Sequence, residues 1–170
     1  KKSRQGVQLV KVLFVCYANA GRSQTAKALY NLFTATDNAH GAGTNVANYF
    51  PEGKTIGEYE KISGHVSRTR SYLKNNFDID IVNSSRVHMT SDLISRHDLV
   101  VNIAERWQTP DWLRGENVIW WDVPDLLPGD SGDSTFIEVE KRVRELIELE
   151  KSRGNFRELD DNIDKEANNG

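Results

Sequence analysis

Short apolar runs recur along the chain and predict buried β-strands. Residues 7–16 and 98–103 are rich in Val, Leu and Ile with few polar interruptions, which is typical of strands buried on both faces of a sheet. A third apolar run, residues 117–123, stops at Pro124. Residues 34–44 are small and polar, and we expect them to form a further strand that runs into a Gly-rich turn at residues 41–43.

Segments with apolar residues every three or four positions separate these strands and predict helices. Residues 23–33 and 134–151 carry apolar side chains on one helical face, and residues 67–77 and 90–96 are shorter predicted helices. Residues 45–62 have little periodicity and contain Pro and Gly, which favours a long surface loop. Strands that alternate with helices predict an α/β fold: a single-domain, three-layer sandwich with a parallel sheet and helices on both faces.

Length and charge narrow the class of protein. The 170 residues suit one domain, and we expect a flexible leader (1–6), the folded domain (7–154) and a charged C-terminal tail (155–170). The formal net charge of -3 does not suggest a nucleic-acid partner. Every apolar run is shorter than the roughly 18 residues that a membrane-spanning helix needs. The oligomeric state stays open.

Cys16 is the single cysteine of the chain. It has no partner for an internal disulfide, and zinc sites built from several cysteines are excluded. A chain without disulfides is most simply cytoplasmic. The four histidines are not spaced as metal-binding pairs, so we expect neither a metal nor another cofactor.

The candidate chemistry lies in residues 16–23, which have the form C-x5-R-S between a predicted strand and a predicted helix. A loop of this length can wrap around a tetrahedral anion with its backbone N–H groups, while the helix adds its positive end. Arg22 can bind two phosphate oxygens through its planar fork, and the positive field favours a nucleophilic thiolate at Cys16. Ser23 can donate a hydrogen bond to the sulfur. The predicted phosphate-binding residues are Tyr17, Ala18, Asn19, Ala20, Gly21, Arg22 and Ser23.

A purely structural interpretation of the same residues makes Cys16 a buried, inert thiol and Arg22 a surface charge on a helix. It would suit a lone cysteine at the end of a strand. The complete loop in a strand–loop–helix context favours the phosphate site instead.

Cleavage of a phosphate ester also needs a proton donor for the leaving oxygen. Asp125 follows the third apolar run and should lie at the same carboxyl edge of the sheet as Cys16. Asp122, Asp130 and Asp133 occupy the same acidic segment and are alternatives.

These motifs together resemble the low-molecular-weight protein tyrosine phosphatases. Residues 12–16, followed by Asn19, Arg22 and Ser23, match the start of that family, and residues 41–44 are similar to its Ser-Ala-Gly-Thr turn. Residues 90–102 and 121–125 resemble a later helix and strand and the approach to the acid loop, so that the likeness covers most of residues 9–150. The resemblance implies a four-stranded parallel sheet, a phosphocysteine intermediate, and Asp125 as first the acid and then the base.

Several positions depart from the family pattern. Leu126 replaces the proline after the acid, and Leu127 and Pro128 stand where tyrosines often line the pocket. Gly21 stands where many members carry a second cysteine. An aromatic wall for the substrate would then have to come from elsewhere, and the candidates are Tyr17, Tyr49 and Phe50.

The expected function is therefore a phosphomonoester hydrolase, in particular a protein tyrosine phosphatase. Its substrate would be a phosphotyrosine protein or a small phosphomonoester, with no nucleic-acid or membrane partner. The alternative is an arsenate reductase that uses an external thiol, because arsenate reductases share this loop and a chain with one cysteine cannot relay oxidation internally. A further alternative is a catalytically silent phosphate-binding module, against which the combination of Cys16, Arg22 and a plausible Asp argues.

Overall fold

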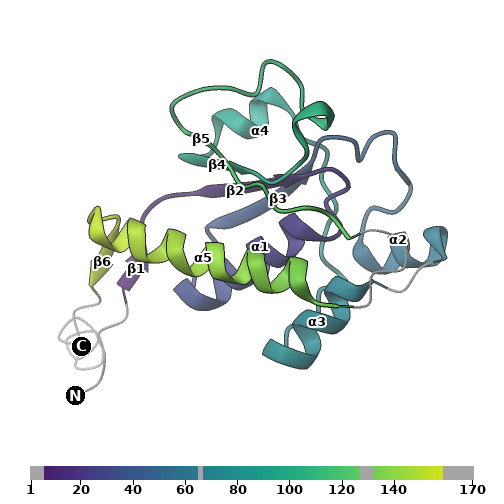
Figure 1. Cartoon of the computed structure of the whole chain (residues 1–170), viewed down its shortest axis with the longest axis horizontal. Coiled ribbons are helices and arrows are strands. Elements are labelled where there is room, and N and C mark those ends of the chain that lie inside the picture. The colour runs from purple at the N-terminus through teal and green to yellow at the C-terminus, as the bar shows by residue number, and fades with distance from the viewer. Residues whose placement is uncertain (1–5, 65–66, 127–131, 159–170) are drawn as a thin grey trace, which may run out of the picture.

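Four parallel strands form the sheet on which the candidate site is built (Figure 1). The computed structural model describes residues 6–64, 67–126 and 132–158. The strand order is β3-β2-β4-β5, so β2, which ends at Cys16, lies inside the sheet. The strands are β2 (Val12–Cys16), β3 (Ala39–Gly43), β4 (Leu99–Asn102) and β5 (Val118–Trp120). The expected α/β class and four-stranded parallel sheet are confirmed.

Helices cover both faces of this sheet (Figure 1). Because side chains alternate along a strand, Phe14 packs with one group of helices, whereas Leu13 and Val15 pack against α4 on the other face. The first group consists of α1 (Arg22–Thr34), α3 (Arg68–Phe77) and α5 (Ser134–Ser152), and α4 is Ser91–Ser95. In the part of the chain that the structure describes, none of the helices is both long and apolar enough to cross a membrane.

Two local predictions are wrong. The segment expected to be a loop contains α2 (Ile56–Ser63), which begins where the Thr55 hydroxyl accepts a hydrogen bond from the Glu58 N–H and where Ile56 is fully buried. Ile56 is the one residue of this helix that is buried. The expected turn at residues 41–43 is part of β3, because Gly41 pairs with Phe14 and Gly43 with Cys16.

The two ends of the described chain pair with each other. The strand β1 (Gly6–Gln8) is antiparallel to β6 (Phe156–Glu158), so regular structure extends beyond the expected domain boundaries at 7 and 154. The remainders of the expected leader and tail, residues 1–5 and 159–170, lie outside the described residues.

The layer of α1 against the sheet should dominate stability. Leu29 on α1 is fully buried in the larger apolar cluster, so Leu29→Ala should lower the free energy of unfolding by about 2–5 kcal/mol. Leu32→Ala on the exposed face of α1 is the matched control and should cost far less. Urea denaturation measures both, and equal losses would contradict this packing.

Candidate active site

The loop between β2 and α1 lies at the carboxyl edge of the sheet, where open α/β sheets bind their ligands. Cys16 is the last residue of β2 and only 2% exposed, and Arg22 is the first residue of α1. Neighbouring segments anchor the loop backbone, since Thr44 N–H donates to Cys16 O at 2.8 Å and Asn45 N–H donates to Tyr17 O at 3.0 Å. The predicted strand–loop–helix context of Cys16 is therefore present.

Asn19 organises the inside of this loop. It adopts a left-handed backbone (φ 49°), is fully buried, and donates from Nδ2 to Ser23 Oγ at 2.7 Å, while its Oδ1 accepts from Val87 N–H at 2.9 Å. Ser23 Oγ lies 2.9 Å from Cys16 Sγ. Because Oγ already accepts from Asn19, the hydroxyl proton of Ser23 is available to the sulfur. This geometry suits a serine that stabilises a thiolate.

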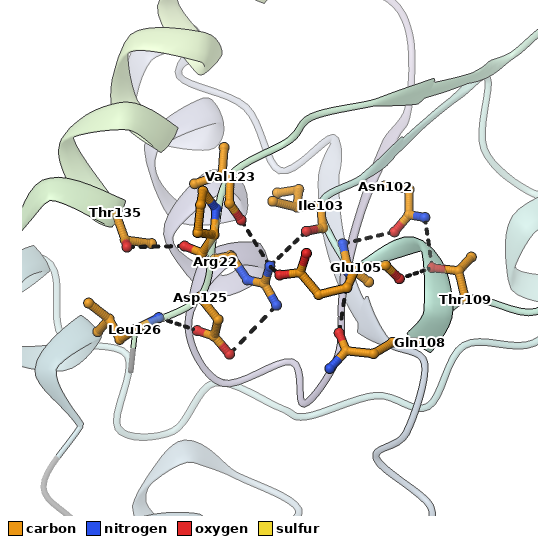
Figure 2. A network of polar contacts seen from close by, with 12 residues as sticks. Arg22, Asn102, Ile103, Glu105, Gln108, Thr109, Val123, Asp125, Leu126 and Thr135 are labelled. Atoms are coloured by element: carbon orange, nitrogen blue, oxygen red, sulfur yellow. Dashed lines mark hydrogen bonds and ion pairs between the residues drawn. The ribbon is translucent and has the colours of Figure 1, made fainter. Parts of the chain in front are cut away.

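Arg22 is buried at 2% exposure, which excludes its interpretation as a surface charge. Its Nη1 donates to Ile103 O and Val123 O, both at 2.9 Å, and to Glu105 Oε1 at 3.0 Å (Figure 2). Ile103 and Val123 follow β4 and β5, so the guanidinium is fixed at the carboxyl ends of two strands. Among the described residues, every hydrogen bond of this guanidinium uses Nη1. Nε and Nη2 form the edge that a tetrahedral anion can engage.

Asp125 lies beside this guanidinium, with Oδ2 3.6 Å from Arg22 Nη2 (Figure 2). Its side chain is 59% exposed and borders a cleft of about 580 Å³ that Glu105 and Trp107 also line. A carboxyl group that is both exposed and adjacent to Arg22 can exchange protons with a bound ester and with water.

The alternative carboxylates have other surroundings. Asp122 is exposed to solvent, and Asp133 lies 3.9 Å from Arg68. Asp130 lies outside the described residues, as do Leu127 and Pro128. Among the described residues, Asp125 forms an ion pair with Arg22 and neither of these two rivals does, so the geometry favours Asp125.

An aromatic cluster borders the loop. The ring centroids of Tyr17 and Tyr49 are 5.6 Å apart, and those of Tyr49 and Phe50 are 4.8 Å apart, so the three aromatic candidates lie together. Tyr59 of α2 joins them, 5.6 Å from Phe50. Burial and the neighbouring Tyr49 raise the pKa of Tyr59 to about 12, which keeps this phenol neutral at physiological pH.

Sequence reasoning missed three residues of this region. Glu105, which accepts a hydrogen bond from Arg22, lies two positions after the predicted strand at residues 98–103, and that position was an available signal. Tyr59 lies in the segment predicted as a loop. Arg86 donates five hydrogen bonds to backbone carbonyls, and nothing in the local pattern of the sequence distinguishes it from a surface arginine.

No metal-binding cluster of three or more His, Cys, Asp or Glu side chains occurs within residues 6–64, 67–126 and 132–158. Arg22 and the N-terminus of α1 supply positive charge for an anion at this edge.

Solved structures identify the fold as that of the low molecular weight protein tyrosine phosphatases. The enzyme of this class from T. tengcongensis is 24% identical over 82% of this chain and 99% of its own, with a TM-score of 0.61. Vibrio vulnificus Wzb, solved with benzylphosphonate, is 17% identical over 85% of this chain and 99% of its own, with a TM-score of 0.58.

The same fold occurs in a thioredoxin-dependent arsenate reductase from Corynebacterium glutamicum, with 22% identity and a TM-score of 0.62. The match covers 86% of this chain but only 64% of that protein, so this chain spans less than two thirds of its length. No protein-family model and no curated protein sequence matches the chain. At these identities the likeness establishes the fold, which phosphatases and arsenate reductases share.

Asn19→Ala tests the internal order of the loop. It leaves the Val87 N–H without its acceptor and puts Ala at a positive φ, so the free energy of unfolding should fall by about 1–3 kcal/mol. Binding of vanadate should also weaken. Asn76→Ala on α3, which removes only a bond to Tyr72 O, is the matched control. Urea denaturation and vanadate titration measure the two effects, and a variant no different from the control would contradict the role of Asn19.

Proposed function

We propose that this chain is a phosphomonoester hydrolase that acts through a phosphocysteine intermediate, with a preference for aryl phosphates such as phosphotyrosine. The observation that carries the proposal is the placement of the Cys16 thiol at the start of an anion-sized loop, with the Nε–Nη2 edge of Arg22 and the Asp125 carboxyl beside it. Thiolate, clamp and acid are the three parts that this chemistry requires.

In the first step the Cys16 thiolate attacks phosphorus. An S–P bond forms, the bond from phosphorus to the ester oxygen breaks, and the proton of Asp125 passes to the departing alcohol or phenol. Arg22 and the loop N–H groups stabilise the charge on the transferring phosphoryl oxygens, which needs no reorganisation because Nη1 of Arg22 is already held by Ile103, Glu105 and Val123.

In the second step water replaces sulfur. Asp125, now a carboxylate, takes a proton from the attacking water, an O–P bond forms and the S–P bond breaks. Ser23 stabilises the departing thiolate through its hydroxyl, 2.9 Å from Sγ. Inorganic phosphate leaves and the proton remains on Asp125, which restores the starting state.

The aryl preference has independent support. Tyr17, Tyr49 and Phe50 form one aromatic cluster whose first member belongs to the phosphate loop. Aromatic side chains favour aromatic partners in offset or edge-to-face contact. Wzb, which has the same fold, was solved with the aromatic phosphonate benzylphosphonate.

The second candidate is an arsenate reductase with an external thiol, favoured by the shared fold of the Corynebacterium glutamicum enzyme. Cys16 would attack arsenate with loss of water, and two external thiols would supply the electrons that reduce As(V) to As(III). Turnover of p-nitrophenyl phosphate, with and without EDTA, beside arsenate reduction with added thiols separates the two. We expect hydrolysis that EDTA leaves unchanged; arsenate reduction without hydrolysis would favour the alternative.

Cys16→Ser should abolish turnover of p-nitrophenyl phosphate while inorganic phosphate still binds. The loop N–H groups and Arg22 hold the anion, whereas sulfur supplies the chemistry. Steady-state kinetics and phosphate titration by calorimetry measure the two properties. Residual turnover above about a hundredth of the wild-type rate would contradict the nucleophile assignment.

Asp125→Asn should lower kcat by about 10²–10⁴ for alkyl phosphates, the usual contribution of a general acid. For leaving groups that need no proton, such as p-nitrophenolate, the rate of the first step should fall only slightly. Burst kinetics with p-nitrophenyl phosphate measures this rate separately from the second step. Asp122→Asn is the matched control, because it also removes an exposed charge, three positions earlier. If Asp122→Asn shows this pattern instead, the acid is misplaced.

A further inference from the structure

We propose that Arg86 is a positioning residue that couples the aromatic cluster to the phosphate loop, so that occupation of the loop by an anion and the order of the 45–59 segment depend on each other. Arg86 is 6% exposed and lies between the two segments. Its guanidinium donates to Ala18 O from Nε at 3.1 Å and from Nη2 at 3.0 Å. It also donates to Tyr49 O at 3.0 Å, Phe50 O at 2.8 Å and Gly53 O at 2.7 Å.

The bond to Ala18 acts on the phosphate loop. A trans peptide is planar, with its C=O and the following N–H on opposite sides. By gripping Ala18 O with two donors, Arg86 fixes the plane of the Ala18–Asn19 peptide and so the direction of the Asn19 N–H. Asn19 is also the residue whose side chain organises Ser23. The two bonds to Ala18 O therefore act on the part of the loop that is linked through Asn19 and Ser23 to Cys16.

The other three bonds act on residues 45–59, the segment that carries Tyr49, Phe50 and Tyr59. Phe50 has a left-handed backbone (φ 51°), which is unfavourable for a bulky residue, and its carbonyl accepts from Arg86. The guanidinium carbon lies 4.3 Å from the centroid of the Tyr59 ring. Arg86 thus holds the backbone from Tyr49 to Gly53 and contacts the ring that packs on Phe50.

All five donor hydrogens of a guanidinium are matched to this set of five bonds. All five bonds go to neutral backbone carbonyls and none goes to a carboxylate. Burial lowers the pKa of Arg86, while Tyr59, Cys16 and Tyr49 oppose that shift, so the residue remains a cation at neutral pH. The positive charge near Cys16 adds to the field that favours a bound anion.

This inference rests on the proposed function only in that the loop binds phosphate. Arg86→Lys and Arg86→Ala test it. A lysine keeps the charge but has one nitrogen, which cannot reach Ala18, Phe50 and Gly53 together. Both variants should lose about 10- to 100-fold in kcat/KM for p-nitrophenyl phosphate, since small misplacements of a binding loop have effects of this size. Added guanidine should partly restore phosphate affinity to Arg86→Ala and not to Arg86→Lys.

Phosphate affinity is measured as protection of Cys16 from iodoacetamide by inorganic phosphate, a readout that does not need turnover. Arg70→Met is the matched control: Arg70 also lies beside α2 but pairs with Glu60 at 3.2 Å and Asp80 at 3.4 Å. If phosphate protects Arg86→Lys, Arg86→Ala and Arg70→Met equally, the coupling is wrong and the proposed function stands. If phosphate does not protect the wild type, the proposed function itself fails.

A measurement on the wild type decides the case if the Arg86 variants do not fold. Saturating inorganic phosphate should slow amide hydrogen exchange in residues 45–59, because the ordered loop and the ordered segment share Arg86. Exchange in α5, which packs against α1, is the internal reference. Unchanged exchange in residues 45–59, with phosphate shown to be bound, would overturn the proposal.

Discussion

The buried guanidinium of Arg22 is the constraint on which the site depends. A buried charge is tolerated only when it is hydrogen-bonded, and here Nη1 of Arg22 receives its partners from the residues that follow two neighbouring strands, Ile103 and Val123, and from Glu105. Because these partners are set by the sheet, the start of α1 and the loop before it have a fixed place. The remaining edge of the fork is directed to the side where Asp125 lies. The hydrogen bonds that stabilise the buried charge of Arg22 thus also fix the orientation of its guanidinium.

The backbone of β3 packs closely against the loop at Tyr17 and Asn19. A Cβ on Gly43 of β3 would come within 2.7 Å of Tyr17 O and 2.8 Å of Asn19 N, so only glycine lets β3 pass this near to the loop. Asn19 joins the loop to Val87 through a hydrogen bond. Arg86 joins the loop, at Ala18, to residues 45–59, at Phe50. Two arginines with different functions therefore flank the same loop. Arg22 presents its Nε–Nη2 edge beside Asp125, whereas all five N–H donors of Arg86 bond to backbone carbonyls.

The parts of this site that are built from residues close together in the sequence could be predicted. The spacing from Cys16 to Ser23 lies within one strand–loop–helix unit, and the alternation of elements predicted the parallel sheet. Glu105 and Arg86 escaped prediction because their roles arise from contacts between residues 33 to 83 positions apart in the sequence. Tyr59 escaped because its helix lies in a segment whose Pro and Gly residues favour a loop. The sequence predicts a turn at residues 41–43, the end of β3, although the small size of Gly41 and Gly43 reflects the crowding against the loop.

The central claim, that Cys16 receives the phosphoryl group within this loop, is tested most directly by trapping the intermediate. Asp125→Ala retains the nucleophile and the clamp but lacks the base for the second step, so the phosphoenzyme should accumulate with p-nitrophenyl phosphate. After an acid quench, mass spectrometry of the peptide that contains residues 16–22 should show one added phosphoryl group on Cys16. A phosphoryl group on another residue, or none while the wild type turns over under the same conditions, would contradict the account.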